Sequence, residues 1–254
     1  MNPGLNTAAE KSPLPYDFSF AAPAYNESVT IEGIVRRWQR MIRDTGIRAE
    51  IIITNDGSSD NTAEILHQLA DEFSNLKVVD NALNQGYGGA LKDAIREARG
   101  RWIVTLDSDG QFDIAEYAQL YDTLIDGKYD VVTGYRDRKR DSFVRFLADR
   151  ALNVMVRILF GVPFRDTNCA LKIYRPETLQ AIEIESGGFS APTEILLKIH
   201  ALGYRIGECE ITHYARAGGA TALKVGKTGW EFFGFLLCLK RKIRRYRRGE
   251  ITEL

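Results

Sequence analysis

Two aspartates one residue apart follow an apolar run in the segment RWIVTLDSDGQFD, residues 101–113. The run up to Leu106 predicts a short buried strand, so Asp107 and Asp109 would stand where that strand ends. Open α/β proteins bind ligands at the carboxyl ends of parallel strands. Adjacent carboxylates repel each other unless a proton or cation intervenes, and Mg²⁺ and Mn²⁺ prefer such oxygen ligands. An ordinary turn uses the same residue types, so the pair alone predicts either a cation site or a turn.

A cluster of arginines is the second candidate for chemistry, in the segment GYRDRKRD (134–141) and the helix predicted after it. A guanidinium group binds phosphate oxygens through two parallel hydrogen bonds, so arginine suits an anionic substrate better than lysine. The alternative is a solvated loop, but we expect at least two of the four to be functional. The members are Arg136, Arg138, Arg140 and Arg145.

Short β-rich runs alternate with amphipathic helical runs, which predicts an α/β protein with a mostly parallel, Rossmann-like central sheet flanked by helices. The predicted strands lie within residues 18–27, 50–62, 77–81, 101–113, 129–136, 166–177 and 204–212. The first is expected to break at Pro23, and Gly203 is expected to end the helix before the last strand. We predict a flexible lead-in over 1–16, one domain over 17–222, and a C-terminal amphipathic polybasic segment over 223–254.

The composition is that of an ordinary globular protein, with 254 residues of which 44% are hydrophobic and 27% charged. Three scattered cysteines lack metal-ligand spacing and suit a reducing compartment. The first residues show no signal-peptide pattern, so we expect a cytoplasmic protein.

The net charge of zero conceals a basic C-terminal segment. KRKIRRYRR (240–248) carries seven cations and no acid, which leaves 27 cations against 34 acids in the rest of the chain. The apolar residues before it, 232–239, fall far short of the ~20 that a spanning helix needs. This predicts a helix that lies on an anionic membrane surface. The alternative is a terminal helix packed on the domain with its basic end in water.

Several segments resemble the family 2 glycosyltransferases of the GT-A fold. Later ones are similar to the polyprenyl- and dolichyl-phosphate sugar synthases, the dolichyl-phosphate mannose synthase branch. The resemblance runs from Phe18 to Thr221 and implies a GDP- or UDP-sugar donor, a divalent cation (Mg²⁺ or Mn²⁺) and inversion at the anomeric carbon. The segments are AYNE (24–27), NDGSSDNT (55–62), NQGYGGALKDAIREARG (84–100), DSDGQ (107–111), GYRDRKRD (134–141), DTNCALKIYRPE (166–177) and ITHYARAGGAT (211–221).

The resemblance also implies site residues at the matching positions. The nucleotide-sugar pocket would contain Pro23, Tyr25, Glu27, Asp56, Gly86, Gly89 and Asp107. The metal and diphosphate would lie among Asp107, Asp109 and Gln111. Phosphates of donor or acceptor would face Arg136, Arg145 and Lys172, and the acceptor side would be lined by Glu194, His213, Tyr214 and Arg216. Two departures, Asn55-Asp56 for an Asp pair and Asn168-Cys169-Ala170-Leu171 for acid-Cys-Gly-Phe, bear on nucleotide and acceptor contacts.

The acceptor determines whether the reaction needs a base. A sugar hydroxyl requires a carboxylate to take its proton, and the candidates are Asp166 and Glu194, each of which could instead pair with an arginine or hold a loop. A lipid monophosphate is already ionised near neutral pH, because its second pKa is near 6. For that acceptor the arginines suffice to position one anion against another.

We therefore predict an inverting transfer of sugar to polyprenyl phosphate, by a peripheral protein on the cytoplasmic membrane face. The alternatives are transfer to a saccharide hydroxyl and, outside enzymes, a membrane-surface binding module. A nucleotidyltransferase would open with a Gly-rich arginine loop, which AAPAYNES is not. Nucleic-acid binding is not expected, because aromatic stacking platforms are not interleaved with the basic residues. Either the basic segment or a membrane-protein partner would hold the chain at the membrane.

Overall fold

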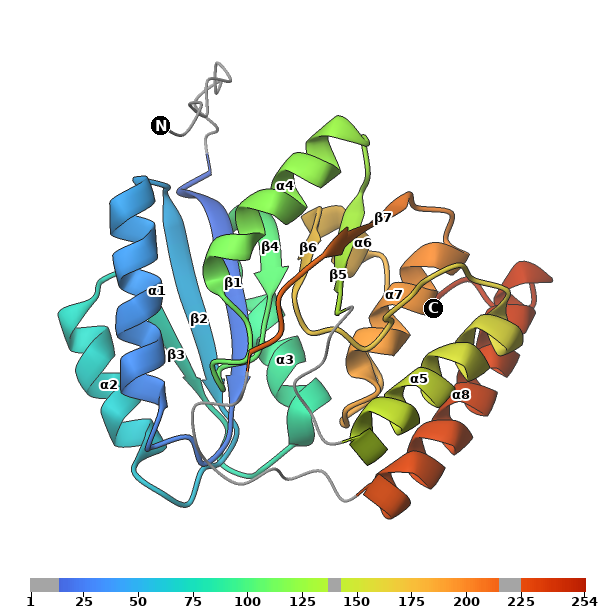
Figure 1. Cartoon of the computed structure of the whole chain (residues 1–254), viewed down its shortest axis with the longest axis horizontal. Helices are drawn as coiled ribbons and strands as arrows, with labels where there is room; N and C mark the ends of the chain where they lie inside the picture. The colour runs from blue at the N-terminus through green and yellow to red at the C-terminus, as the bar shows by residue number, and fades with distance from the viewer. Residues whose placement is uncertain (1–13, 137–142, 215–224) are drawn as a thin grey trace.

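A mixed sheet forms the centre of the structure, a computed structural model that describes residues 14–136, 143–214 and 225–254 (Figure 1). The described residues form seven strands in the order β3-β2-β1-β4-β6-β5-β7. Strand β6 runs antiparallel to both neighbours and the other pairings are parallel, which confirms the mostly parallel sheet. The strands are β1 (Tyr16–Ala24), β2 (Ala49–Asn55), β3 (Leu76–Asp80), β4 (Gly100–Thr105), β5 (Val131–Tyr135), β6 (Lys172–Tyr174) and β7 (Ile206–Glu210).

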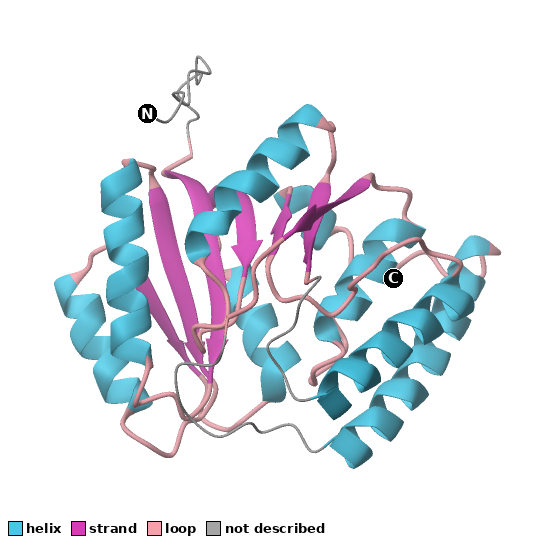
Figure 2. Ribbon diagram, in the orientation of Figure 1, coloured by secondary structure: helices cyan, strands magenta, loops and turns pink. Residues whose placement is uncertain are grey.

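Helices cover both faces of the sheet (Figure 2). Buried residues of α1, α2 and α4 form one core with the sheet, and those of α3, α5, α6, α7 and α8 form a second core on the other face. The helices are α1 (Ile31–Thr45), α2 (Thr62–Glu72), α3 (Gly86–Arg96), the 3₁₀ turn η1 (Ile114–Glu116), α4 (Tyr117–Asp126), α5 (Phe143–Phe160), α6 (Pro176–Gln180), α7 (Ala191–Ala201) and α8 (Val225–Arg247).

The run EIIIT in β2 shows why the sequence produces this layered arrangement. All seven residues of the strand are buried, as expected for a parallel strand that is covered on both faces. Because side chains alternate along a strand, Ile51 and Ile53 enter one core and Ile52 enters the other.

The strand β1 and the helix α7 show how the predicted ends compare with the structure. Gly203 has a φ of 88° just past α7, which confirms it as the end of that helix. Pro23 was predicted to break the first strand, but β1 continues through it to Ala24. The pairing of β1 with β4 stops at Ala21, so Pro23 lies beside β2 alone and a missing N–H is tolerated there.

The apolar stripe of α8 packs against the protein. Phe232, Leu236, Leu239 and Ile243 recur at helical spacing and are buried in the core that α7 also lines. Helix α8 lies beside α5 in Figure 1, with Lys240 and most of the later cations exposed. The apolar stripe therefore agrees with the second interpretation of this segment, a terminal helix packed on the domain. Over the described ranges, no helix is both long and apolar enough to cross a membrane.

Candidate functional site

The sheet topology brings three of the predicted site residues to one edge. Parallel strands end at this edge, toward the bottom of Figure 1, and the antiparallel β6 begins there. Thr105 of β4 and Thr133 of β5 both align with Lys172, the first residue of β6. Asp107, just after β4, and Arg136, just after β5, therefore stand at the same edge as Lys172.

The carboxylate pair is held by hydrogen bonds from its own loop and from α3. The hydroxyl of Tyr87 donates to Oδ1 of Asp107 at 2.8 Å, and the backbone N–H of Gln111 donates to Oδ1 of Asp109 at 3.0 Å. Between them, Ser108 donates to the carbonyl of Pro23 at 2.6 Å, which ties the loop to the end of β1. The pair is thus fixed next to a residue predicted for the nucleotide pocket.

The two carboxylates are an unfavourable pair without a counter-ion. Burial, and after it the charge of Asp109, raises the pKa of Asp107 to about 7, although the cations of Arg136 and Lys172 act to lower it. A hard divalent cation would remove this repulsion, and the oxygen donors fit Mg²⁺ or Mn²⁺. The described part of the chain contains no group of three or more His, Cys, Asp or Glu suited to a metal. Two carboxylates that share the ion with substrate phosphates are the arrangement usual for Mg²⁺.

Arg136 and Asp166 form a nearly buried ion pair. Nε of Arg136 donates to Oδ2 of Asp166 at 2.7 Å and Nη2 donates to Oδ1 at 3.2 Å. Burial opposes the positive charge, but Asp166 outweighs it, so the pKa of Arg136 is raised. A guanidinium has five N–H donors, and this pair uses two of them. Asp166 therefore adopts the arginine-pairing role that the sequence left open beside that of a base.

Lys172 is a fully buried cation beneath the same edge. Its Nζ donates to the carbonyl of Cys169, and burial lowers its pKa to about 8. The charges of Asp166 and Asp107 favour the protonated form, and that of Arg136 disfavours it. Lys172 thus places positive charge between the carboxylate pair and the Arg136 ion pair.

The loops after β1 and β2 brace each other at the predicted nucleotide pocket. Asn26, which has a φ of 55°, accepts a bond from the N–H of Ser59 at 2.8 Å. The N–H of Glu27 donates to Thr62 at 2.9 Å, and the N–H of Ser28 donates to Asp60 at 3.1 Å. Glu27 is buried and Tyr25, two residues earlier, is exposed. These hydrogen bonds fix the backbone of the loop that carries Tyr25 and Glu27 relative to the start of α2.

Asp56 anchors the start of α3. Its carboxylate is buried and accepts the N–H of Gln85 at 2.8 Å, the N–H of Gly86 at 2.9 Å and the amide of Asn81 at 3.1 Å. A carboxylate at a helix N-terminus also interacts favourably with the helix dipole. Asp56 therefore organises the helix end that carries Gly86 and Gly89, which the resemblance predicts for the nucleotide-sugar pocket.

The glycines of α3 allow another protein segment to approach closely. A Cβ on Gly86 would lie 2.3 Å from the carbonyl oxygen of Gly187, and one on Gly88 would lie 1.9 Å from that of Ser186. The N–H of Gly88 donates to Gly187 at 3.0 Å. These two glycines thus permit contact with the loop before α7. A Cβ on Gly89 would meet only the Gln85 side chain.

Glu194 holds that same loop in place. Both of its oxygens accept backbone N–H groups, from Glu185 at 3.0 Å and Ser186 at 2.8 Å. It also pairs with Lys198 at 2.7 Å, and both side chains are fully buried. Lys198 additionally donates to the carbonyl of Glu183 at 2.6 Å. These contacts explain why a carboxylate stands at position 194 without assigning it a catalytic role.

The segment after β7 folds onto the loop of the carboxylate pair. The N–H of Tyr214 donates to the carbonyl of Gln111 at 2.9 Å, and His213 is buried with its ring edge-on to Phe112 at 5.5 Å. The structure thus brings Gln111, His213 and Tyr214 together. Of the remaining predicted residues, Arg145 lies on α5, and three lie outside the described residues: Arg138, Arg140 and Arg216.

Tyr87 is a site residue that the sequence reasoning missed. The segment NQGYGGAL draws attention to its glycines, and the tyrosine between them is the signal that could have found it. Its ring stacks on Phe189 with 5.6 Å between centroids. Burial, and then the nearby Asp107, raises the pKa of Tyr87, so the hydroxyl remains a donor.

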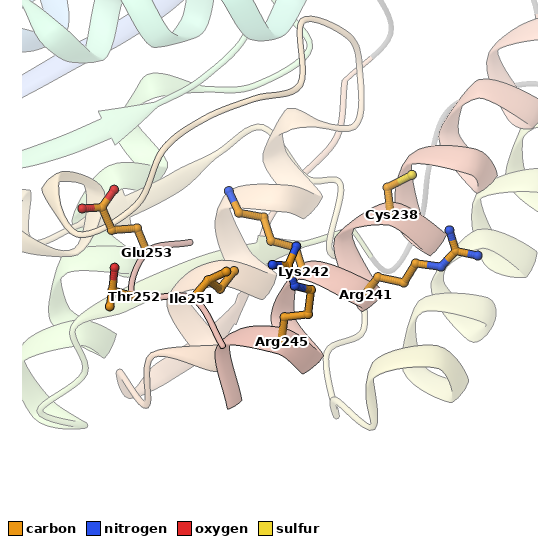
Figure 3. Close-up of a pocket in the computed structure, with 7 residues that line it drawn as sticks. All are labelled: Cys238, Arg241, Lys242, Arg245, Ile251, Thr252 and Glu253. Carbon is orange, nitrogen blue, oxygen red and sulfur yellow. The ribbon is translucent and has the colours of Figure 1, made fainter. Parts of the chain in front are cut away.

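A cavity of about 630 Å³ lies elsewhere, along the second half of α8 and the segment that follows it (Figure 3). It is open and basic, and contains none of the predicted site residues. Its lining is Cys238, Arg241, Lys242, Arg245, Ile251, Thr252 and Glu253.

Comparison with known proteins agrees with the motif pattern. The model of the family described as glycosyl transferase family 2 matches residues 19–189. The undecaprenyl-phosphate 4-deoxy-4-formamido-L-arabinose transferase of Pseudomonas paraeruginosa is 32% identical over 232 residues, which cover 89% of this chain and 66% of that protein. The dodecaprenyl-phosphate galacturonate synthase of Rhizobium johnstonii is 28% identical, with 84% of this chain and 63% of that protein covered. The chain thus spans just under two thirds of the length of these curated relatives.

Solved structures of the same shape include the glucosyl-3-phosphoglycerate synthase of Mycobacterium tuberculosis. Its complex with phosphoglyceric acid superposes with a TM-score of 0.70 at 20% identity, over 88% of this chain and 80% of that one. Its complex with Mn²⁺ and uridine-diphosphate-glucose gives a TM-score of 0.69 at 21% identity, over 88% and 79%. The predicted GT-A fold is confirmed.

Proposed function

Since the chain belongs to glycosyl transferase family 2, we propose that it transfers a sugar from a nucleotide-sugar donor to a polyprenyl phosphate. One observation carries the proposal: a carboxylate pair, the nearly buried Arg136 and the fully buried Lys172 stand at the same edge of the sheet. Such an edge suits two phosphate-bearing substrates. The names of the relatives, which act on undecaprenyl and dodecaprenyl phosphates, support the same class of acceptor.

The donor would bind at the edge formed by β1, β2 and β4. Asp107 and Asp109 would hold Mg²⁺ or Mn²⁺, which stabilises the charge on a departing diphosphate. The cross-braced loops after β1 and β2 would position the nucleoside, with Tyr25 and Glu27 on one of them. The first turn of α3, whose N–H groups at Gln85 and Gly86 are taken up by the Asp56 carboxylate, would form a fixed wall of the donor site.

The acceptor phosphate would bind beside Arg136 and Lys172. Two of the five N–H donors of Arg136 are used by Asp166, and the others can orient a phosphate oxygen toward the anomeric carbon. The nucleophile needs no base, because a monophosphate is ionised near neutral pH. Both carboxylates that could serve as a base are engaged, Asp166 with Arg136 and Glu194 with Lys198 and two backbone amides. This favours a phosphate acceptor over a saccharide hydroxyl.

The test is a transfer assay with the full chain, Mn²⁺ and a panel of labelled UDP- and GDP-sugars. Undecaprenyl phosphate and a mixture of soluble saccharides are the two acceptors. We expect labelled lipid in the first arm and none in the second. Product found only with saccharides would favour the hydroxyl acceptor. As a check on the base, Glu194→Gln should keep most of the turnover per folded molecule, because the amide oxygen can still accept one of the two backbone N–H groups and Lys198 keeps its pair with Glu185.

The proposal includes peripheral contact between α8 and the anionic cytoplasmic face of a membrane. Because its apolar stripe is buried, the contact would depend on exposed cations such as Arg241 and Arg244, each worth about 1 kcal/mol near an anionic surface. Removing the whole helix would expose the core, so charge reversal is the cleaner test.

The measurement is co-sedimentation with vesicles that contain 30% phosphatidylglycerol, at low and high salt. We expect Arg241→Glu/Arg244→Glu to reduce binding about tenfold or more and salt to weaken the binding of the unsubstituted chain. The matched control is Arg37→Glu/Arg40→Glu, which reverses two exposed cations on α1. Equal loss in both variants would contradict a specific role of α8.

A further inference from the structure

Tyr87 connects three parts of the site that are distant in sequence. It lies in the first turn of α3, its hydroxyl donates to Oδ1 of Asp107 at 2.8 Å, and its ring stacks on Phe189 from the loop before α7 at an interplanar angle of 29°. One side chain thus links the start of the helix, the carboxylate pair and that loop.

We propose that Tyr87 is a positioning residue for the divalent cation: its hydroxyl holds Oδ1 of Asp107 and would leave Oδ2 to bind the ion. The inference rests on the proposed metal site at Asp107 and Asp109. The hydroxyl acts on the ion only through the carboxylate, as hydrogen-bond partners behind metal ligands do in other proteins.

The repulsion between the two carboxylates explains why Asp107 needs such a partner. Two carboxylates one residue apart lower their energy by rotating away from each other. The terminal torsion of an aspartate side chain has a broad energy minimum, so a hydrogen bond is needed to fix its orientation. Asp109 is held by the N–H of Gln111 within its own loop. Asp107 is held from outside the loop, by Tyr87. The hydrogen bond from Tyr87 would therefore limit the rotation of the Asp107 carboxylate before a cation binds.

The tyrosine can do this because its own ring is fixed. Phe189 covers the ring, and the loop that carries Phe189 is anchored to Glu194 by two backbone hydrogen bonds. On the other side, the N–H of Gly88 donates to Gly187 of the same loop at 3.0 Å. A rigid donor loses little entropy when it holds its acceptor.

A purely packing role for Tyr87 makes a different prediction from a positioning role. Tyr87→Phe keeps the ring and its stack on Phe189 and removes only the hydroxyl. If the ring alone matters, this variant will bind metal as the unsubstituted chain does. If the hydroxyl positions Asp107, metal affinity falls while the fold is kept.

The experiment measures Mn²⁺ binding to the full chain by water-proton relaxation, with thermal unfolding as a check on the fold. We expect Tyr87→Phe to bind Mn²⁺ about tenfold more weakly. The matched control is Tyr121→Phe, whose ring packs edge-on against Phe18 and Trp102 in the opposite core, and its affinity should not change. In the transfer assay, excess Mn²⁺ should restore most of the rate of Tyr87→Phe, because the ligands themselves are intact.

The outcomes separate this inference from the function on which it rests. Unchanged Mn²⁺ affinity in Tyr87→Phe, beside clear binding by the unsubstituted chain, would overturn the role of Tyr87 alone. An equal loss in Tyr121→Phe would also overturn it, because the effect would then be one of packing. Failure of the unsubstituted chain to bind Mn²⁺ at all would overturn the metal site itself, and this role with it.

Discussion

The half of the sheet edge proposed to bind the donor (β1, β2 and β4; the donor half) and the half proposed to bind the acceptor (β5, β6 and α7; the acceptor half) are stabilised in different ways. Around β1, β2 and β4, loops are fixed mainly by hydrogen bonds between backbone N–H groups and side chains such as Asp56 and Asp60. Around β5, β6 and α7, buried ion pairs dominate, namely Arg136 with Asp166 and Lys198 with Glu194. The acceptor half therefore contains paired charges together with the buried cation of Lys172, whereas the donor half contains adjacent like charges.

This difference shows where each half depends on its ligands. Asp107 and Asp109 repel each other when both are ionised, so the donor half would gain most from a bound cation. In the acceptor half, Arg136 and Lys198 already have carboxylate partners, and a buried pair broken on one side costs far more than it contributes when intact. We therefore expect substitutions in the donor half to affect activity and those in the acceptor half to affect stability as well.

The largest effect is expected at the carboxylate pair. Asp109→Asn should reduce transfer at least about 10³-fold, or about 4 kcal/mol of transition-state stabilisation, because it removes a charged ligand of the cation. The metal-free variant should unfold at a temperature no lower than the unsubstituted chain, because the repulsion with Asp107 is relieved. Steady-state transfer and thermal unfolding measure the two effects.

The control for this variant is Asp126→Asn, which removes an exposed carboxylate at the end of α4. It should leave both transfer and unfolding within experimental error. If Asp109→Asn instead lost stability and kept its rate, the carboxylate pair would be structural and the contrast between the halves would be wrong.

Lys198→Met should give the largest loss of stability, about 3–5 kcal/mol in the free energy of unfolding. It leaves the fully buried Glu194 without its cation. The double variant Lys198→Met/Glu194→Gln should recover most of this loss, because the buried charge of Glu194 is gone and the amide oxygen can still accept one of the two backbone hydrogen bonds. Denaturant unfolding of the double-mutant cycle is the measurement.

The half-exposed pair Lys77–Glu97 provides the comparison for that cycle. Lys77→Met should cost less than about 1 kcal/mol, as exposed ion pairs do. A similar cost at both positions would show that burial of the Lys198 pair does not set its energy.

Arg136→Lys tests whether the acceptor half uses the shape of the guanidinium as well as its charge. Lysine keeps the charge but cannot make the two-point bond to Asp166 and orient a phosphate at once. We expect transfer to fall about 100-fold, or roughly 2.7 kcal/mol, with a smaller change in stability. Arg48→Lys is the control, because Arg48 makes the same two-point bond to Asp17 at an exposed position. A full rate in Arg136→Lys would show that charge alone suffices there.

Much of the donor half could be predicted from sequence because its signals are local. The run before Asp107 predicted β4, and the alternation of strands and helices predicted the sheet. Arg136 was selected for phosphate chemistry, but its partner Asp166 is 30 residues away. Pairing over such a distance depends on the strand order, which composition and spacing do not determine.

Glu194 and α8 show two further limits of sequence reasoning. A carboxylate near a predicted site has the same letter whether it accepts backbone N–H groups, as Glu194 does, or takes a proton from a substrate. An apolar stripe such as that from Phe232 to Ile243 identifies the face that is covered but not what covers it. Here the cover is the core shared with α5 and α7, and membrane contact stays a prediction for the basic face.

The smallest effect on the free energy of unfolding at neutral pH is expected from Lys172→Met. The sign of this effect should depend on pH. Burial lowers the pKa of Lys172 to about 8, below that of a lysine in the unfolded chain, near 10.4. Between these values the unfolded state binds more protons, so the stability of the unsubstituted chain rises with pH. Methionine removes this dependence, together with the hydrogen bond to Cys169.

The net change in the free energy of unfolding at pH 7 should be within about 1 kcal/mol, since the loss of a hydrogen bond and the relief of a buried charge oppose each other. The difference should then shift against the variant by roughly 1 kcal/mol per pH unit from pH 8 to 10. Denaturant unfolding at four pH values measures it, and a constant difference would mean that Lys172 keeps its proton throughout this range.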